Sequence, residues 1–302
     1  MKSLRYSVLL MVLVLAAVDL GLPASSDMVS HERGSPAREL SPSGPIRIES
    51  DTDFNATAAA EGWPGNGSPD SPYIIENLDI DANGADNAVM ISNTTYDFII
   101  RNCIMRGAGS NGYRIGAGMG ILIDNVLNGT IESNEFVDNL NGGIYLRNSR
   151  KMIVRNCTVS GDEGYIGLVG EALQEVRIED CSFRLSHGNG MFVSSSSSII
   201  LKNNHIPRPL EYGMSIRSSS DMLIQENTIG SGDRFSLLLY MVVNSRMYSN
   251  RLLGTRLSVS IFPPFFGALE IPPNNTVDGA PIYFFKNGDF SGKGFPWMRA
   301  RS

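Results

Sequence analysis

A repeat of about 23 residues runs through the middle of this 302-residue chain and restricts it to folds built from stacked, similar units. The repeat is marked by positions that carry only Asn or Cys: Cys103, Asn134, Cys157, Cys181, Asn204, Asn227 and Asn250. Their spacings are 31, 23, 24, 23, 23 and 23 residues, so the first interval is one repeat with an eight-residue insertion.

Apolar residues keep fixed distances from the markers. Pairs such as Ile121 with Ile123, thirteen and eleven residues before a marker, enclose one variable position, and this period of two predicts a strand with one buried face. A second strand precedes each marker by five to three residues, and a third is expected from the marker to two residues beyond it. The column three residues before the marker is Ile100, Ile131, Val154, Ile178, Leu201, Ile224 and Met247. Glycine recurs fourteen residues before the marker, at Gly120, Gly143, Gly167, Gly190 and Gly213.

Three short strands per repeat predict an all-β fold, a single-stranded right-handed parallel β-helix of about nine rungs over residues 44–287. Neighbouring rungs of such a coil lie about 4.8 Å apart and hydrogen-bond to each other, so equivalent residues lie on one another. Helical and leucine-rich repeats do not fit because no segment has a 3.6-residue period. An antiparallel sandwich would not repeat its register so strictly.

The marker column is polar or thiol, yet it is expected to point into the coil. Stacked Asn side chains can pass amide hydrogen bonds from rung to rung, and so satisfy groups whose unpaired burial costs about 1–3 kcal/mol each. Cys is small and buries readily, so a structural role is expected for all three cysteines. A disulfide between Cys157 and Cys181 is the alternative, although in-register side chains about 4.8 Å apart are slightly too distant for bonded Cβ atoms.

The two ends of the chain differ from the repeat. Residues 1–26 are expected to be a signal peptide, because two basic residues precede an apolar run over 8–18 and small residues follow it. That run is shorter than the roughly 20 residues that span a bilayer, so a secreted or cell-surface protein without a membrane span is expected after cleavage. An uncleaved anchor is the alternative. Residues 27–43 are expected to be a linker and 288–302 an irregular tail.

Each end of the coil needs a cover for its exposed strand edges. A short helix over residues 53–61, with Asp53 as its N-cap, is expected to cover the first rung. Residues 280–285 are expected to form one last strand. The tail does not resemble a cap, so either the chain is truncated or the last rung is left open, and an open rung could associate end to end with another copy.

The charge balance excludes one class of partner. The formal net charge is −6 and no basic patch is visible, so we expect no nucleic-acid partner. In an exported protein the Asn-x-Ser/Thr triplets can accept glycans, and they stand at Asn55, Asn66, Asn93, Asn128, Asn156 and Asn274.

Two segments resemble known proteins. Residues 65–76, which read Gly-Asn-Gly-Ser-Pro-Asp-Ser-Pro-Tyr-Ile-Ile-Glu, resemble the entry segment of prokaryotic surface proteins with parallel β-helix repeats. Residues 274–287 resemble a motif of the NosD-like β-helix family, within the pectin-lyase-like superfamily. The resemblance covers residues 45–287. It implies the β-helix fold and a surface or carbohydrate-associated protein, and it implies no particular reaction.

In superfamily members that are polysaccharide lyases or hydrolases, the reacting groups usually lie on the outward face of the strand after the glycine column. In this chain that face carries Asp124, Tyr145, Arg147, Glu171 and Arg217, which are candidate binding residues for a polysaccharide or other glycan. Asp124 and Glu171 lie two rungs apart, near the long end of the carboxylate spacing of inverting glycosidases. Because the charges alternate in sign, a solvated charge ladder is the alternative, and no catalytic residue is assigned.

The insertion over residues 107–118 is rich in glycine and is expected to bulge out beside this face. Loops on a rigid scaffold are common binding sites, and Tyr113 and Arg114 could stack on or hydrogen-bond a sugar. A tolerated insertion without function is the alternative. A phosphate-binding loop is excluded because no Lys-Ser/Thr ends the segment.

The NosD name implies copper, but the ligands that copper prefers are not clustered. His31, His187 and His205 are scattered, and the methionines of the repeat occupy apolar columns. We therefore expect no metal site and no cofactor.

These observations leave three hypotheses. The first is a non-catalytic, exported surface module that binds or displays carbohydrate. The second is a polysaccharide lyase or glycoside hydrolase that acts in the outward groove, and the third is a purely structural envelope protein. The sequence favours the first because its charged and aromatic outward residues form no recognisable catalytic set.

Overall fold

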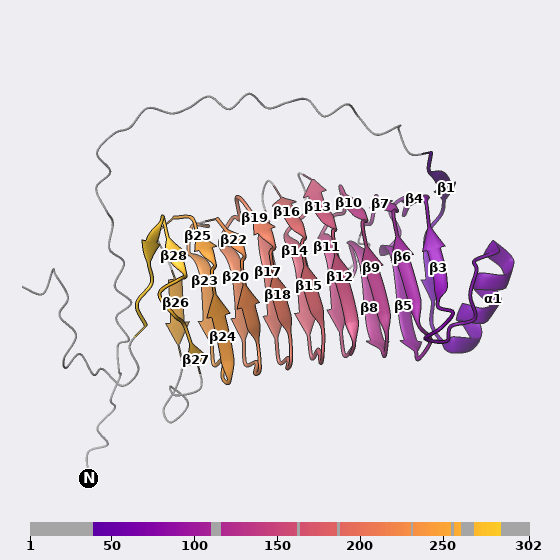
Figure 1. Ribbon diagram of the computed structural model, residues 1–302. Coiled ribbons are helices and arrows are strands. Elements are labelled where there is room, and N and C mark those ends of the chain that lie inside the picture. The colour runs from indigo at the N-terminus through magenta and orange to yellow at the C-terminus, as the bar shows by residue number, and fades with distance from the viewer. Residues whose placement is uncertain are drawn as a thin grey trace, which may run out of the picture.

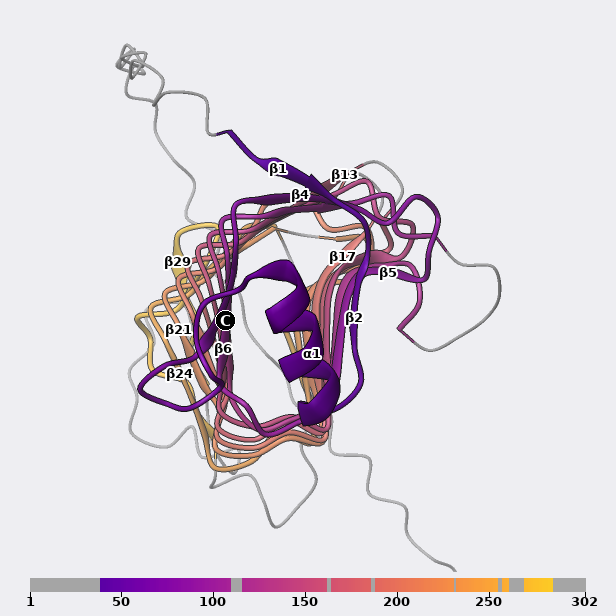
Figure 2. The ribbon, with the colours of Figure 1, turned by 90° about the vertical axis from the view of Figure 1, so that its right-hand side faces the viewer.

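The computed structural model describes residues 39–109, 116–161, 164–185, 188–230, 232–254, 257–260 and 269–284. Its strands lie side by side along one axis, with a single helix, α1 (Asp51–Glu61), at one end (Figure 1). Viewed along that axis, successive coils overlie one another and α1 crosses the open end of the first (Figure 2). The expected signal peptide, most of the expected linker and the expected tail at 288–302 lie outside the described residues.

Three sheets form the sides of the coil, and each successive strand of a sheet comes from the next turn, except β29 at the end of the first sheet. The first sheet comprises β1 (Ser41–Ser43), β4 (Leu78–Asp81), β7 (Ile104–Arg106), β10 (Glu135–Val137), β13 (Thr158–Gly161), β16 (Ser182–Leu185), β19 (His205–Ile206), β22 (Thr228–Ile229), β25 (Arg251–Leu252), β28 (Thr276–Val277) and β29 (Ala280–Pro281).

The second sheet carries the candidate site. It comprises β2 (Ile46–Ile48), β5 (Asn87–Thr94), β8 (Met119–Val126), β11 (Gly142–Arg147), β14 (Ile166–Glu171), β17 (Asn189–Ser194), β20 (Tyr212–Arg217), β23 (Phe235–Tyr240) and β26 (Leu257–Ser260). The third comprises β3 (Tyr73–Glu76), β6 (Phe98–Arg101), β9 (Gly129–Glu132), β12 (Met152–Arg155), β15 (Arg177–Glu179), β18 (Ile200–Lys202), β21 (Leu223–Gln225), β24 (Ser245–Tyr248) and β27 (Leu269–Glu270).

The pairing confirms the predicted all-β parallel coil, with about eight turns. Val154 pairs with Ile178, and Ile178 with Leu201, so equivalent residues of successive repeats are register partners. All three are fully buried, as are the corresponding residues of the neighbouring turns. Each such buried aliphatic side chain contributes roughly 1.5–3 kcal/mol, and it needs a turn above and below to become buried. The third strand of each turn begins one residue after the marker, not at the marker as expected.

The glycine column fills a place where the coil has no room for a side chain. A Cβ at Gly143 would lie 2.5 Å from Val159 Cγ2, and one at Gly190 would lie 2.4 Å from Ile206 Cγ2. Val159 and Ile206 belong to the column two residues after the marker, which packs against the glycines inside the coil. Glycine therefore fits this corner in five successive turns, and the small residues Ala88 and Ser236 take the same place in the turns on either side.

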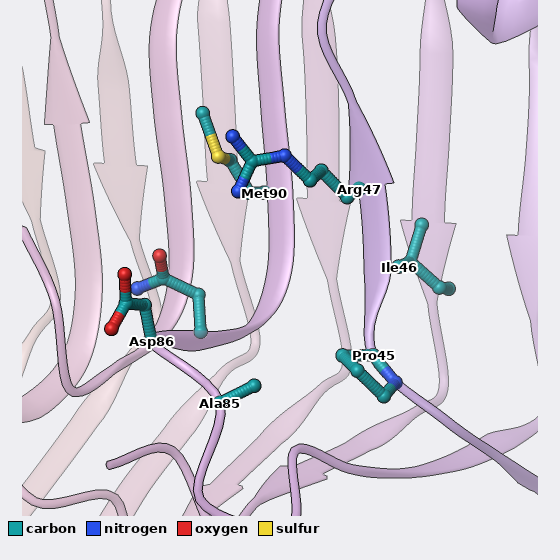
Figure 3. A pocket seen from close by; sticks show the side chains of 7 residues that line it. Pro45, Ile46, Arg47, Ala85, Asp86 and Met90 are labelled. Carbon is teal, nitrogen blue, oxygen red and sulfur yellow. The ribbon is translucent and has the colours of Figure 1, made fainter. Parts of the chain in front are cut away.

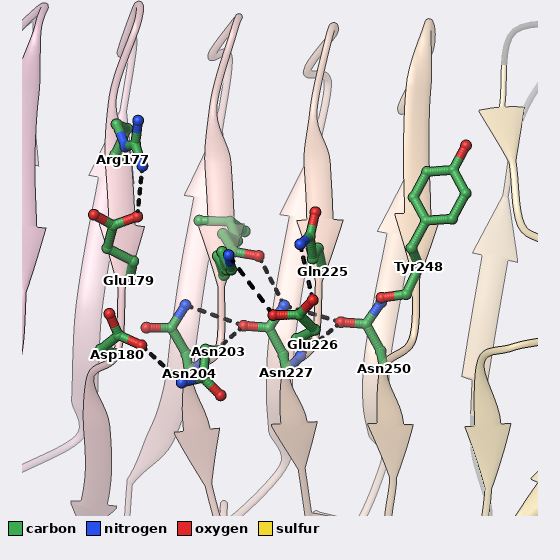
Figure 4. A network of polar contacts seen from close by, with 12 residues as sticks. Arg177, Glu179, Asp180, Asn203, Asn204, Gln225, Glu226, Asn227, Tyr248 and Asn250 are labelled. Atoms are coloured by element: carbon green, nitrogen blue, oxygen red, sulfur yellow. Dashed lines mark hydrogen bonds and ion pairs between the residues drawn. The ribbon is translucent and has the colours of Figure 1, made fainter.

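The marker column forms a ladder of buried amides (Figure 4). Asn204 donates from Nδ2 to Asn227 Oδ1 at 3.0 Å, and Asn227 donates to Asn250 Oδ1 at 2.9 Å. In the earlier turns the column holds three buried thiols and the buried amide of Asn134. Cys157 and Cys181 are free, so the disulfide considered from the sequence is not formed. A hydrogen bond with Cys157, together with burial, raises the pKa of the Cys181 thiol, which therefore stays protonated.

The N-terminal cap differs in detail from the expectation. Its N-cap is Ser50, whose hydroxyl accepts from the Asp53 amide, so the helix begins two residues earlier than expected and Asp53 lies within it. Phe54 of this helix is fully buried against Tyr73, with ring centroids 4.8 Å apart. Parallel pairing also starts earlier, because β1 pairs with β4 from Ser41, within the segment expected to be linker.

The C-terminal end also differs from the expectation. The last strand, β29, covers only Ala280–Pro281 and runs antiparallel to β28. It was expected to extend over residues 280–285. Antiparallel pairing turns the chain back on itself and covers the edge of the first sheet.

Candidate functional site on the outward face of the second sheet

The outward face of the second sheet is where sequence reasoning places the candidate binding residues. On the longer strands up to three side chains point outward: two alternate with the core positions, and a third precedes the glycine column by one residue. On β8 these are Met119, Leu122 and Asp124. The glycine shifts the alternation because its own position faces the core. Equivalent outward residues lie side by side on successive strands, as the pairs Tyr145–Val169 and Arg147–Glu171 show.

One part of this face is covered by the end of the insertion. The Gly116 carbonyl accepts from Asn87 Nδ2 at 2.7 Å, and the Ala117 carbonyl accepts from Asn141 Nδ2 at 2.7 Å. These bonds hold residues 116–118 across the sheet. Leu122 and Tyr145 lie beneath and are only 6% and 4% exposed. Tyr145 therefore does not offer an open ring to a ligand.

The phenol of Tyr145 is paired with a carboxylate. It donates to Glu171 Oε2 at 2.5 Å. Burial, together with this hydrogen bond to Glu171, raises the pKa of Tyr145 to about 12, so the phenol stays protonated at neutral pH. Tyr145 is a poor general base in this state, and Glu171 is held by it.

The second carboxylate of the face is also held. Asp124 Oδ2 accepts from Arg147 Nη2 at 2.7 Å, and Asp124 Oδ1 accepts from Asn148 at 3.1 Å. The hydrogen bond to Asp124 raises the pKa of Arg147, which keeps its charge. The structure thus brings Asp124, Tyr145, Arg147 and Glu171 together in two hydrogen-bonded pairs, Asp124 with Arg147 and Tyr145 with Glu171.

Further along the coil the face is open and aromatic. Phe192 on β17, Tyr212 on β20, and Phe235 and Tyr240 on β23 lie on three successive strands, and we call them the aromatic stripe. The Tyr212 and Phe235 rings stack with centroids 6.1 Å apart. Tyr240 is 38% exposed and the other three are half-buried.

Arg217 and Arg234 lie on the aromatic stripe. The Arg217 guanidinium lies 5.4 Å from the centroid of the Phe192 ring, and its Nε donates to Ser215 Oγ at 3.2 Å. The Arg234 guanidinium lies 5.8 Å from the Tyr212 centroid and donates to the Tyr212 hydroxyl at 3.2 Å. Arginine stacks readily on aromatic faces because its planar charge is weakly hydrated.

Small hollows lie at the other end of the face, near the cap. One of about 170 Å³ is lined by Pro45, Ile46, Arg47, Ala85, Asp86, Asn87 and Met90 (Figure 3). Another of about 170 Å³ continues along the same strands to Ala117, Leu122 and Arg147. Both are smaller than the roughly 300–1,000 Å³ of typical small-molecule sites. The open stripe, which presents its groups on a flat sheet, is therefore the stronger candidate for a large ligand.

Part of this site was predicted from the sequence. Tyr113 and Arg114 lie outside the described residues. Tyr212, Phe235 and Arg234 were not predicted, because only residues after the glycine column were assigned to the outward face. The signal that could have found them is the pair of aromatics at the position before the glycine column, in the two adjacent repeats that end at Asn227 and Asn250.

Among the described residues, no group of three or more His, Cys, Asp or Glu side chains is placed to hold a metal ion. None of the helices in the described part of the chain is long and apolar enough to cross a membrane.

The comparison with protein families agrees with the observed fold. Residues 119–261 match the family model described as a right-handed β-helix region. No curated protein matches the sequence. Among solved structures, the chain is similar to an alginate lyase from Paenibacillus sp. str. FPU-7, at 12% identity and a TM-score of 0.42, over 78% of this chain and 96% of the lyase. The lyase activity belongs to that enzyme. With its three parallel sheets, and with the family match over residues 119–261, the chain has the fold of a right-handed parallel β-helix.

Proposed function

We propose that the protein is an exported, non-catalytic surface module that binds carbohydrate on the aromatic stripe. The observation that carries the proposal is the set of four partly exposed aromatic side chains on β17, β20 and β23. Contiguous exposed apolar groups beside polar ones mark binding surfaces, and the C–H faces of sugar rings pack on aromatic faces. Tyr212 and Phe235 are register partners, and Phe192 and Tyr240 lie further along β17 and β23, so the rings are spread over the sheet and suit an extended ligand.

A binding role is favoured over catalysis by the state of the carboxylates. Asp124 is held by Arg147, and Glu171 accepts from a phenol that stays protonated. A general acid and base pair needs groups that are free to exchange protons with a substrate. The residues that were the best catalytic candidates are therefore structural in this proposal.

A glycan array with purified protein tests the proposal. Wild-type protein is expected to bind a defined set of glycans, and Phe192→Ala and Tyr240→Ala are expected to weaken that binding about tenfold, as loss of an aromatic anchor does. Tyr248→Ala is the matched control, because Tyr248 lies on β24 of the third sheet. Absence of glycan binding, or equal loss in the control, would leave the purely structural role.

An activity assay separates the enzyme hypothesis. Uronic-acid and neutral polysaccharides incubated with the protein are expected to show no new unsaturated or reducing ends. Release that disappears in Asp124→Asn or Glu171→Gln would contradict the non-catalytic role.

A further inference from the structure

Among the described strands of the second sheet, two of the three arginines, Arg47 and Arg147, have a carboxylate partner. Arg147 pairs with Asp124. On the other two sheets Arg106 is paired with Asp79, and Arg155 with Glu132. Such pairing is common among the described arginines but not general, because Arg184 on β16 bonds to Ser182 and has no ion pair there.

Arg217 has no such partner. Its register neighbours are Ser194 on β17 and Tyr240 on β23, both uncharged. Within the described part of the chain, no carboxylate lies within 4.0 Å of its guanidinium. Arg217 is half-buried, so its guanidinium loses part of its hydration. No carboxylate of the described residues compensates for that loss.

The guanidinium of Arg217 is nevertheless held in place. One of its faces lies on the Phe192 ring, and Ser215, itself buried, accepts from Nε. Among the described residues no hydrogen-bond partner lies at Nη1 or Nη2. These two groups form one side of the planar fork that binds carboxylate, sulfate or phosphate oxygens in pairs. Preorganisation of the fork lowers the entropy lost on binding.

We propose that Arg217 is an anion-binding subsite on the aromatic stripe, and that the glycan bound there carries carboxylate or sulfate groups. The inference rests on the proposed glycan-binding function and names its ligand class. Phe192 and Tyr240 pack on the sugar rings, and Arg217, between them, pairs with the acidic substituent. Arg234 on Tyr212 does not provide a second subsite, because Glu211 already lies 3.6 Å from it.

The test uses pairs of polymers that differ only in charge. The probes are polygalacturonate with its fully methyl-esterified form, and dextran sulfate with dextran. Binding is measured by calorimetry for wild type, Arg217→Gln, Arg217→Lys and Arg246→Gln. The last variant removes the same charge from an exposed arginine of β24 on the third sheet. Thermal unfolding of each variant without polymer checks that the variant is folded.

Wild type is expected to bind one charged polymer about tenfold or more tightly than its neutral partner, because hydrogen bonds to charged groups are the stronger ones. Arg217→Gln is expected to remove this preference, Arg217→Lys to keep part of it, and Arg246→Gln to leave it unchanged. The polymer pair that shows the preference identifies carboxylate or sulfate as the group recognised. Added NaCl is expected to weaken the binding of the charged polymer but not that of the neutral one. This comparison needs only the wild-type protein.

The outcomes separate the two proposals. Equal binding of charged and neutral polymers, or a preference that survives Arg217→Gln, overturns the anion subsite and leaves glycan binding intact. A wild-type protein that binds no member of either pair and no glycan on the array overturns both.

Discussion

Asn204 and Asn227 lie one above the other in the core, and Asn204 donates to Asn227 Oδ1 from both its main-chain N, at 2.9 Å, and its side-chain Nδ2, at 3.0 Å. Asn227 in turn donates to the Leu201 carbonyl at 2.8 Å. One side chain thus satisfies three buried groups of the preceding turn. This cross-rung pairing explains why a polar residue recurs at an inward position.

Replacement of Asn227 by Ala is expected to lower the free energy of unfolding by about 3 kcal/mol or more, because each buried group left unpaired costs about 1–3 kcal/mol. Chemical denaturation with a constant m-value measures the change. Asn203→Gly is the control, since Asn203 is exposed beside Asn204 and already has a φ of 51°. A loss below 1 kcal/mol for Asn227→Ala would show that the ladder is not needed for stability.

Gly213→Ala is expected to destabilise the coil by about 1–3 kcal/mol through overpacking. A Cβ there would lie 2.2 Å from Ile229 Cγ2 and 2.4 Å from the Ser236 carbonyl oxygen, so backbone as well as side chain must move. Gly44→Ala serves as control because nothing lies within 4 Å of its Cβ position. Thermal unfolding of both variants is the measurement, and equal melting temperatures would contradict the packing explanation of the glycine column.

Ala172 offers a stabilising substitution. It is exposed at a turn with a φ of 52°, a left-handed conformation that costs a residue with a Cβ roughly 1–2 kcal/mol. Ala172→Gly is therefore expected to raise the free energy of unfolding by about 0.5 kcal/mol after the greater entropy of the unfolded chain is deducted. The same exchange at Ala59, exposed in α1, is expected to cost about 1 kcal/mol. Changes of the same sign in the free energy of unfolding at the two sites would contradict the left-handed conformation of Ala172.

The N-terminal cap is expected to loosen in acid. Burial opposes ionisation of Asp51, but hydrogen bonds from Thr94 and Thr95 outweigh it, and the pKa of Asp51 is lowered in the folded protein. A carboxyl with a lowered folded pKa contributes stability above its unfolded value near 3.8, and this contribution is lost as the pH falls through the folded value. Asp51 links α1 to the turn after β5, so the cap is the part released.

Trp63 reports on this release because its ring packs edge-on against Phe54 of α1. In a Trp297→Phe background, Trp63 fluorescence is expected to change below about pH 4, the upper end of the interval over which this contribution is lost. Asp51→Asn should alter the emission at neutral pH and reduce its acid dependence. An acid transition identical in Asp51→Asn would assign the change to other groups.

The repeat columns were sufficient to predict the coil and its register, because vertical stacking forces like residues into like environments. Residues such as Ile178 and Asn227 could be assigned to the core from spacing alone. The inward direction of the glycine column could not, because a single glycine shifts the alternation of side chains in a way that spacing does not show. The N-cap was misplaced for a local reason, since Ser50, Asp51 and Asp53 are all suitable caps.

The candidate site was predictable only in outline. The sequence placed Tyr145 and Arg217 on one outward face, but it gave no indication that the end of the insertion crosses that face and buries Tyr145. That path depends on side-chain amides, Asn87 and Asn141, which bind carbonyls of the insertion. The difference between the hydrogen-bonded pairs at Asp124 and Glu171 and the unpaired Arg217 likewise depends on side-chain contacts that equal spacing does not determine.

Distances between spin labels test the in-register stack most directly. Cysteines for labelling replace outward residues of one column on the third sheet, with Arg246 as the common partner of Thr130 or Ile74. Successive register partners separate these sites by five and seven turns. At about 4.8 Å per turn, the account predicts backbone separations of about 24 and 34 Å in pulsed electron resonance. Separations that do not increase with the number of intervening turns would contradict the parallel coil.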